Sequence, residues 1–187
     1  MLSVEYLSRE ELEAGLDHIR QAPREQGTLK MIVQRPLEDE RNVIDEAELS
    51  LSEGLVGDNW KARGSQHTPD GAAHLYAQIT VMNARCIALL AQSESRWGLA
   101  GDQLYVDFDL SDENLPPGTQ FRVGSAILEV SAEPHTGCKK FSSRFGVEAM
   151  KFVNSPEGKR LHLRGINARV IQPGTIRLGD AVSKLGS

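Results

Sequence analysis

The stretch Pro117-Gly118-Thr119-Gln120-Phe121-Arg122-Val123-Gly124-Ser125-Ala126 returns, one residue shorter, as Pro173-Gly174-Thr175-Ile176-Arg177-Leu178-Gly179-Asp180-Ala181. Each copy is typical of a Pro-Gly turn, a short strand and a Gly turn that leads into another strand. Two copies are too few for a solenoid. A closed sheet needs glycine bends where its strands turn corners, so the repeat predicts two related hairpin corners in a closed or nearly closed β-barrel.

Apolar patterning on either side of the repeat predicts the other strands and the helices. Residues 29–35 are branched and apolar up to Pro36, and residues 104–108 alternate in polarity, so both segments favour strands. Helices are expected over residues 8–21, which open with a Ser8–Glu11 capping box, and over residues 83–92 and 142–153. The chain therefore predicts an α+β fold, mainly β, built as a β-barrel with about three peripheral helices.

The whole chain, residues 1–187, is expected to form one domain. Its 187 residues with 40% hydrophobic content suffice for one core, and no linker divides them. Residues 1–53 hold the first helix, the first strand and the start of a long polar connection over residues 37–71. Long connections in compact domains are often functional, so we expect this one to set ligand specificity.

Composition excludes several classes of function. A net charge of -5 leaves no polycationic surface for nucleic acid. No apolar run approaches the ~20 residues of a membrane span and the start of the chain is unlike a signal peptide, so we expect a cytoplasmic protein without membrane association. Phosphate-loop, dinucleotide and serine-nucleophile motifs are absent from the sequence, which disfavours nucleotide-driven chemistry and serine hydrolysis.

Cys138 is the strongest candidate for chemistry. It follows a strand-like run and precedes Lys139 and Lys140, near the start of an expected helix. Cations and a helix N-terminus both favour the thiolate, the form in which cysteine attacks or binds a metal. His135 is close enough to act as a base, so Cys138, His135 and Lys139 are the catalytic candidates. The alternative is that Cys138 is a small buried packing residue, as we expect of Cys86.

Histidine spacing gives no clear closed metal site. His135 and Cys138 lie three residues apart and would need His67 or His74 from the long connection to complete a ligand set. A structural zinc site requires four ligands in one place, so we disfavour this interpretation.

Other polar residues are candidates for holding a ligand. Glu113 and Asn114 lie in a loop between expected strands and would point into a cleft, although an Asx turn before Pro116 also explains Asn114. Guanidinium groups bind planar anions through paired hydrogen bonds, whereas arginine on a strand is more often only solvated. The basic and amide candidates are Lys140, Arg144, Arg164, Asn167 and Arg169.

Five short segments follow one another in a characteristic order. They are Gly54-Leu55-Val56-Gly57-Asp58, Glu113-Asn114-Leu115, Val123-Gly124-Ser125-Ala126-Ile127-Leu128-Glu129-Val130, His135-Thr136-Gly137-Cys138-Lys139-Lys140-Phe141 and Arg164-Gly165-Ile166-Asn167-Ala168-Arg169-Val170. This ordered set resembles the MOSC family, the C-terminal domain of molybdenum cofactor sulfurases and its stand-alone relatives. The resemblance covers residues 54–182. It implies a barrel of the pyruvate-kinase-barrel type and a site built around one cysteine, here Cys138.

The resemblance further implies a molybdenum-cofactor-linked thiol protein. Relatives use the cysteine to carry sulfur as a persulfide or to ligate molybdenum in the molybdopterin cofactor, and some reduce N-hydroxylated compounds. These uses of Cys138 stay open, beside that of a non-catalytic module that binds a small molecule. Pyridoxal phosphate is implied only by association with the family, because no residue of the sequence indicates the lysine that would bind it as a Schiff base. A cysteine desulfurase or an electron-donating protein is the implied partner.

The chain departs from the family pattern at one loop. Many relatives carry a basic residue and a histidine after the Gly-Asp pair, where this chain has Asn59-Trp60. The resemblance therefore assigns no catalytic role to this loop. The chain also lacks the aminotransferase-like sulfurase domain and the additional N-terminal β domain of larger relatives, which is why a separate donor of sulfur or electrons is expected.

Overall fold

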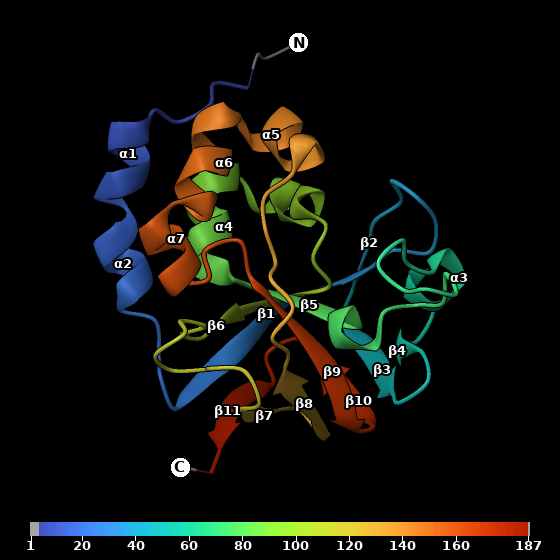
Figure 1. Ribbon diagram of the computed structural model, residues 1–187. Coiled ribbons are helices and arrows are strands. Elements are labelled where there is room, and N and C mark those ends of the chain that lie inside the picture. The colour runs from blue at the N-terminus through green and yellow to red at the C-terminus, as the bar shows by residue number, and fades with distance from the viewer. Residues whose placement is uncertain (1–3, 187) are drawn as a thin grey trace.

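The computed structural model describes residues 4–186 and has a closed barrel of seven strands, which lies below α4, α5 and α6 in the view of Figure 1. The strands follow the order β11-β7-β8-β9-β5-β6-β1, and β1 pairs with β11 to close the ring. They are β1 (Gln26–Gln34), β5 (Ile79–Asn83), β6 (Leu104–Asp107), β7 (Gln120–Val123), β8 (Ala126–Val130), β9 (Ile166–Gln172) and β11 (Ala181–Leu185). The predicted α+β barrel is confirmed.

A smaller sheet lies beside the barrel and contains β10 (Gly174–Arg177), β3 (Glu46–Ser50) and β4 (Gly54–Leu55). β3 and β4 belong to the long polar connection, which also carries β2 (Asn42–Ile44) and α3 (Trp60–Arg63). The connection is held at two places, because β2 pairs with β1 and β3 pairs with β10. It therefore forms an ordered wall beside the barrel, with the short strand pieces that its sequence indicates.

The two copies of the repeat adopt different pairings. The first forms the predicted hairpin between β7 and β8. In the second, β10 pairs with β3 in the smaller sheet while β11 pairs with β7 and β1 in the barrel, so the prediction of a second hairpin corner is wrong. The two copies instead meet each other, because the Ser125 N–H donates to the Thr175 carbonyl oxygen at 3.1 Å. The second copy thus joins the two sheets.

Each segment expected to be helical contains a helix, but two segments are divided. Residues 8–21 hold α1 (Arg9–Ala14) and α2 (Leu16–Arg20), residues 83–92 hold α4 (Ala84–Ala91), and residues 142–153 fall on α5 (Lys139–Phe145) and α6 (Val147–Asn154). The sequence did not indicate α3, α7 (Pro156–Arg160) or the 3-10 turns η1 (Leu75–Ala77) and η2 (Glu94–Ala100). None of the helices within residues 4–186 has the length and apolar character needed to cross a membrane.

Gly146 is the reason that α5 and α6 are separate. Its φ of 94° and ψ of 160° lie in a region open essentially to glycine alone. A Cβ at this position would stand 2.9 Å from the ring of Tyr6. The chain turns here, and α5 begins at Lys139 rather than at Ser142. Cys138 is the residue that caps the N-terminus of α5.

Apolar residues form two cores, one on each side of the barrel wall. Val81 and Val106 point into the barrel, whereas their neighbours Met82 and Tyr105 pack outside it against the helices. Successive residues of a strand face opposite sides, so a strand that is covered on both faces is apolar throughout. This explains why Val81 and Met82 of β5, and Leu104, Tyr105 and Val106 of β6, are consecutive apolar residues.

Candidate functional site

A cavity of about 770 Å³ opens beside the first turn of α5. Its other wall is the long connection, which lies on the side of the barrel away from α1 and α2 (Figure 1). Most of the residues predicted from sequence line this cavity, namely Cys138, His135, Lys140, Arg144, Arg164 and Asn167. The fold thus brings the Cys138 segment and the start of β9 to one place.

Cys138 lies at the rim of the cavity and is exposed. The residue before it is pinned by Asn154, whose side chain accepts a hydrogen bond from the Gly137 N–H at 2.8 Å and donates one to the Gly137 carbonyl oxygen at 3.0 Å. Its exposure does not fit the alternative of a packing cysteine. Cys86, in contrast, is fully buried on α4, and burial raises the pKa of its thiol to about 12.

His135 faces the buried carboxylate of Asp102. Its Nδ1 lies 3.5 Å from Asp102 Oδ1, too far for a good hydrogen bond, and neither atom has another partner. Burial, together with Arg164 and Arg35, holds the pKa of His135 well below its usual value. The imidazole is therefore neutral near pH 7. The chain can approach β5 closely at Gly165 only without a side chain, because a Cβ there would stand 2.4 Å from the Val81 carbonyl oxygen.

Arg164 is locked into the wall of the cavity by three contacts. Its Nη1 is 2.5 Å from Asp102 Oδ2, its Nη2 donates to the Ala100 carbonyl oxygen at 2.8 Å, and its guanidinium lies 4.9 Å from the centre of the Phe141 ring. Burial raises the pKa of Asp102, and Arg164 offsets only part of that rise. Arg164 Nε remains buried without a partner.

Three further arginines line the cavity, and sequence reasoning missed them. Arg35 is held by Asp58 through two bonds of 2.8 Å. Within residues 4–186, Arg41 and Arg63 have no acidic partner within 4 Å. Burial and the neighbouring Arg144 and Arg35 lower the pKa of Arg41, and burial and Arg35 lower that of Arg63. Of the six lysines and arginines that line the cavity, Arg41 and Arg63 are therefore the two without a counter-ion among residues 4–186.

Several polar atoms around the cavity are buried and unsatisfied. Among residues 4–186, the buried atoms without a hydrogen-bond partner include Arg41 Nε, Asn59 Oδ1, His135 Nδ1 and Arg164 Nε, all on lining residues. Buried polar atoms normally have partners, so a cluster of exceptions in one cavity indicates a place for ligand atoms. Asn59 belongs to the loop that departs from the family pattern. That loop therefore shapes the cavity.

The cations of α5 are engaged by acids from the long connection. Lys140 Nζ lies 2.9 Å from Glu38 Oε1 and 3.6 Å from Asp39 Oδ1, and Arg144 Nη2 lies 3.0 Å from Asp39 Oδ1. The hydrogen bond from Lys140 to Glu38 raises the lysine pKa. Lys139 is the first residue of α5 and is exposed, but it does not line the cavity.

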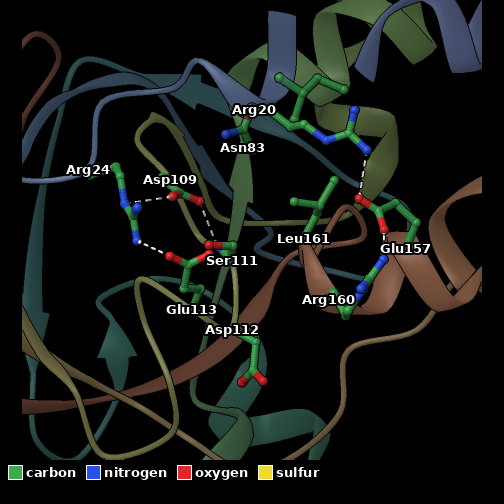
Figure 2. A pocket seen from close by; sticks show the side chains of 11 residues that line it. Arg20, Arg24, Asn83, Asp109, Ser111, Asp112, Glu113, Glu157, Arg160 and Leu161 are labelled. Carbon is green, nitrogen blue, oxygen red and sulfur yellow. Dashed lines mark hydrogen bonds and ion pairs between the residues drawn. The ribbon is translucent and has the colours of Figure 1, made fainter. Parts of the chain in front are cut away.

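The remaining predicted residues lie elsewhere or have a structural partner. Glu113 pairs with Arg24 at 3.1 Å in a different pocket (Figure 2). The Asn114 amide donates to the Arg24 and Asp109 carbonyl oxygens at 2.9 and 2.8 Å, which fixes its loop and keeps both residues out of the Cys138 cavity. Arg169 is paired with Glu129 at 2.9 Å.

Asn167 belongs to the cavity but also has a positioning role. Its side-chain amide donates to the carbonyl oxygens of Glu133 and Pro134 at 3.1 and 3.3 Å, directly before His135. No group of three or more His, Cys, Asp or Glu side chains within residues 4–186 is arranged to hold a metal ion.

Comparison with solved structures supports the fold assignment. YuaD from Bacillus subtilis is similar with a TM-score of 0.58 and 17% identity, over 84% of this chain and 94% of that one. YiiM from Escherichia coli has a TM-score of 0.54 and 20% identity, over 86% and 70% of the two chains. YiiM from Geobacillus stearothermophilus has a TM-score of 0.53 and 13% identity, over 86% and 73%. A search of curated proteins found no match.

The sequence itself matches a family model over residues 67–183, which is more than half of the chain. The matched region runs from the long connection to β11 and contains Cys138, His135, Arg164 and Asn167. The family is that of the MOSC domain, which is associated with molybdenum cofactor sulfurase and with molybdopterin-binding proteins. This chain therefore belongs to the MOSC domain family.

Proposed function

We propose that the cavity binds the molybdenum cofactor through the anionic groups of its pterin, with Cys138 as the sulfur ligand of the metal. One observation carries the proposal: an exposed thiol shares a cavity with two arginines, Arg41 and Arg63, that have no acidic partner within residues 4–186. An uncompensated arginine pair beside unsatisfied buried atoms suits a phosphate-bearing ligand.

The lining residues fit such a ligand. Arg41 and Arg63 would hold the phosphate, the buried Asn59 Oδ1 would accept a hydrogen bond from the pterin, and Arg164 Nε would donate one. When bound, the cofactor would supply a metal centre that exchanges electrons or oxygen atoms. The protein's own part is to present Cys138 as the thiolate, the form that binds metals.

The groups around Cys138 include two cations and a neutral imidazole. Lys140 and Arg144 belong to the helix that Cys138 caps, and both line the same cavity. His135 is neutral near pH 7 and adds no positive charge, so it is suited to accept a hydrogen bond or a proton. Arg164 cannot move far, because Asp102 and Ala100 hold two of its nitrogens.

The decisive test compares the metal content of matched cysteine variants. Protein made in cells that synthesise the molybdenum cofactor should contain molybdenum and pterin, and Cys138→Ala should lose the molybdenum while keeping its unfolding midpoint, since an exposed rim residue contributes little to the core. Cys86→Ala removes the other thiol and should retain the metal. Equal molybdenum in wild type and Cys138→Ala would reject the ligand role.

The exposure of Cys138 also favours a second candidate, a sulfur carrier. The Cys138 thiolate would attack the outer sulfur of a persulfide on a cysteine desulfurase. The new S–S bond would form at Cys138 as the donor's S–S bond breaks, and the donor cysteine would leave as a thiolate. Incubation with a desulfurase and labelled cysteine should label wild type and Cys86→Ala but not Cys138→Ala. An unlabelled wild type would reject this candidate.

Reduction of N-hydroxylated compounds is the third use of Cys138 that the family allows. It would need an electron-donating partner, because the reduction consumes electrons that must come from a separate donor. Transfer of electrons from a reduced flavoprotein or haem protein to the molybdenum-loaded protein would be its measurable sign. Loaded protein that stays oxidised with every such donor would argue against it.

A further inference from the structure

An acidic turn lines part of the cavity. Residues 37–40, which we call the acidic strap, form a turn in which the Glu40 N–H donates to the Leu37 carbonyl oxygen at 3.2 Å. Asp39 sits in this turn with a φ of 61°, a conformation that is uncommon outside glycine. Held in this way, Asp39 directs its carboxylate toward both Lys140 and Arg144.

The strap reaches cations that are distant in sequence. The bond between Lys140 and Glu38 joins residues 102 positions apart, and that between Arg144 and Asp39 joins residues 105 positions apart. The side chains of Glu38 and Asp39 are 81% and 61% exposed. Ion pairs with this exposure are weak and are screened by salt, so another anion can displace them.

A carboxylate on a lysine or an arginine occupies the position that an oxygen of an anionic ligand would take. All four residues of these pairs line the same cavity as Cys138. The cavity therefore has two sets of cations: Arg41 and Arg63, without acidic partners within residues 4–186, and Lys140 and Arg144, covered by Glu38 and Asp39. The covered set lies on the helix that Cys138 caps.

We infer that the acidic strap is an internal competitor of the anionic ligand. It occupies Lys140 and Arg144 while the cavity is empty and is displaced when the ligand's anionic groups bind there. The inference rests on the proposed function, because it takes the ligand to be an anion. It adds that loading of the site is resisted by the protein's own carboxylates, and that removing these charges strengthens binding.

Alkylation of Cys138 measures this competition directly. Iodoacetate is an anion and iodoacetamide is neutral, and both form an S–C bond with the thiolate as iodide leaves. The ratio of the two rates cancels the fraction of thiolate and reports the local potential. In Glu38→Gln/Asp39→Asn we expect the iodoacetate-to-iodoacetamide ratio to rise about threefold or more at low salt, with a smaller rise at high salt. Asparagine tolerates the positive φ of residue 39.

The same assay tests displacement by an anion. Inorganic phosphate should protect Cys138 from iodoacetate, and half-protection should need about threefold less phosphate in the strap variant. Glu13→Gln/Glu46→Gln is the matched control, because it removes two carboxylates from exposed ion pairs with Arg9 and Arg177 and changes the net charge equally. Cys138→Ala gives the background from the buried Cys86.

The outcomes separate the two proposals. A strap variant that behaves like the control in both rate ratio and phosphate protection overturns the competitor role, even if the protein binds molybdenum. A strap variant that shows the rise, in a protein that takes up neither molybdenum nor sulfur, supports the strap and rejects the proposed function. The alkylation readout needs neither the cofactor nor a partner protein.

Discussion

His135 shows how one largely buried side chain ties the site to the stability of the fold. The ring lies against a fully buried aspartate and next to two arginines, and these surroundings, with burial foremost, depress its pKa. A histidine in the unfolded chain titrates near its ordinary value of 6.5. As the pH falls below about 6.5, His135 therefore stays unprotonated in the folded chain but takes up a proton in the unfolded chain.

This difference predicts a pH dependence of stability. Below about pH 6.5 the unfolded chain binds more protons, so the free energy of unfolding should fall with pH by up to about 1.4 kcal/mol per pH unit from this one residue. The contribution is fully present above about pH 6.5 and is lost as the pH falls towards the depressed pKa of the folded state. Urea titrations of wild type and His135→Gln between about pH 7 and pH 5.5 check it, because the variant lacks this slope.

An exposed histidine provides the control for this prediction. His18→Gln replaces a side chain on the surface of α2 and should keep the wild-type slope. Equal slopes in wild type, His135→Gln and His18→Gln would contradict a depressed pKa at His135.

At the scale of elements, Gly146 separates α5, which Cys138 caps, from α6. Gly146→Ala introduces a Cβ into a conformation that side chains avoid and places it against Tyr6. We expect a loss of about 2–4 kcal/mol in the free energy of unfolding, from backbone strain and the clash together. Denaturant titration measures the loss, and alkylation rates at Cys138 show whether α5 has shifted.

Gly118→Ala separates strain from crowding. Gly118 has a φ of 88°, but a Cβ there would have no atom within 4 Å. Its cost should be about 1–2 kcal/mol, from strain alone, with no effect on Cys138. If Gly146→Ala and Gly118→Ala lower the free energy of unfolding equally, the contact with Tyr6 adds no cost and the predicted clash is refuted.

For the whole molecule, closure of the barrel depends on β11. Val182 is completely buried in this strand and lies opposite Gly27 of β1 and Val123 of β7. Val182→Ala should lower the free energy of unfolding by about 2 kcal/mol, since it removes two buried carbon atoms and leaves a small void. Val43→Ala makes the same chemical change on the exposed strand β2 and should cost within about 0.5 kcal/mol. Equal costs would mean that the seam is not tightly packed.

The sequence predicted those parts of the molecule that local patterns determine. The individual strands, the first hairpin and the segment around Cys138 each follow from neighbours within about ten residues, through turn chemistry and periodicity. The second repeat copy, by contrast, has the sequence pattern of a hairpin, but its two strands do not pair with each other. Instead β10 pairs with β3 and β11 pairs with β1. Which strand they pair with depends on the whole topology, and a local pattern does not record it.

The same distinction applies to the candidate site. His135, Lys140 and Arg144 were predicted because they are close to Cys138 in sequence, and they line its cavity. Arg41 and Arg63 lie about 75 to 100 positions away and reach the cavity only because the long connection folds back against the barrel. In the sequence, the Gly57-Asp58 turn was the feature that pointed to this side of the cavity, because Asp58 binds Arg35.

The bridging role of β10 and β11 also orders events during biosynthesis. Strand β3 of the long connection pairs with β10, and the barrel is closed by β11, so both pairings depend on residues 174–185. These residues follow Cys138 by 36 to 47 positions in the chain, so they leave the ribosome after it. A nascent chain thus exposes the Cys138 thiol before the barrel is closed, and we expect a ligand that needs the finished cavity to be captured only after translation has passed the last strand.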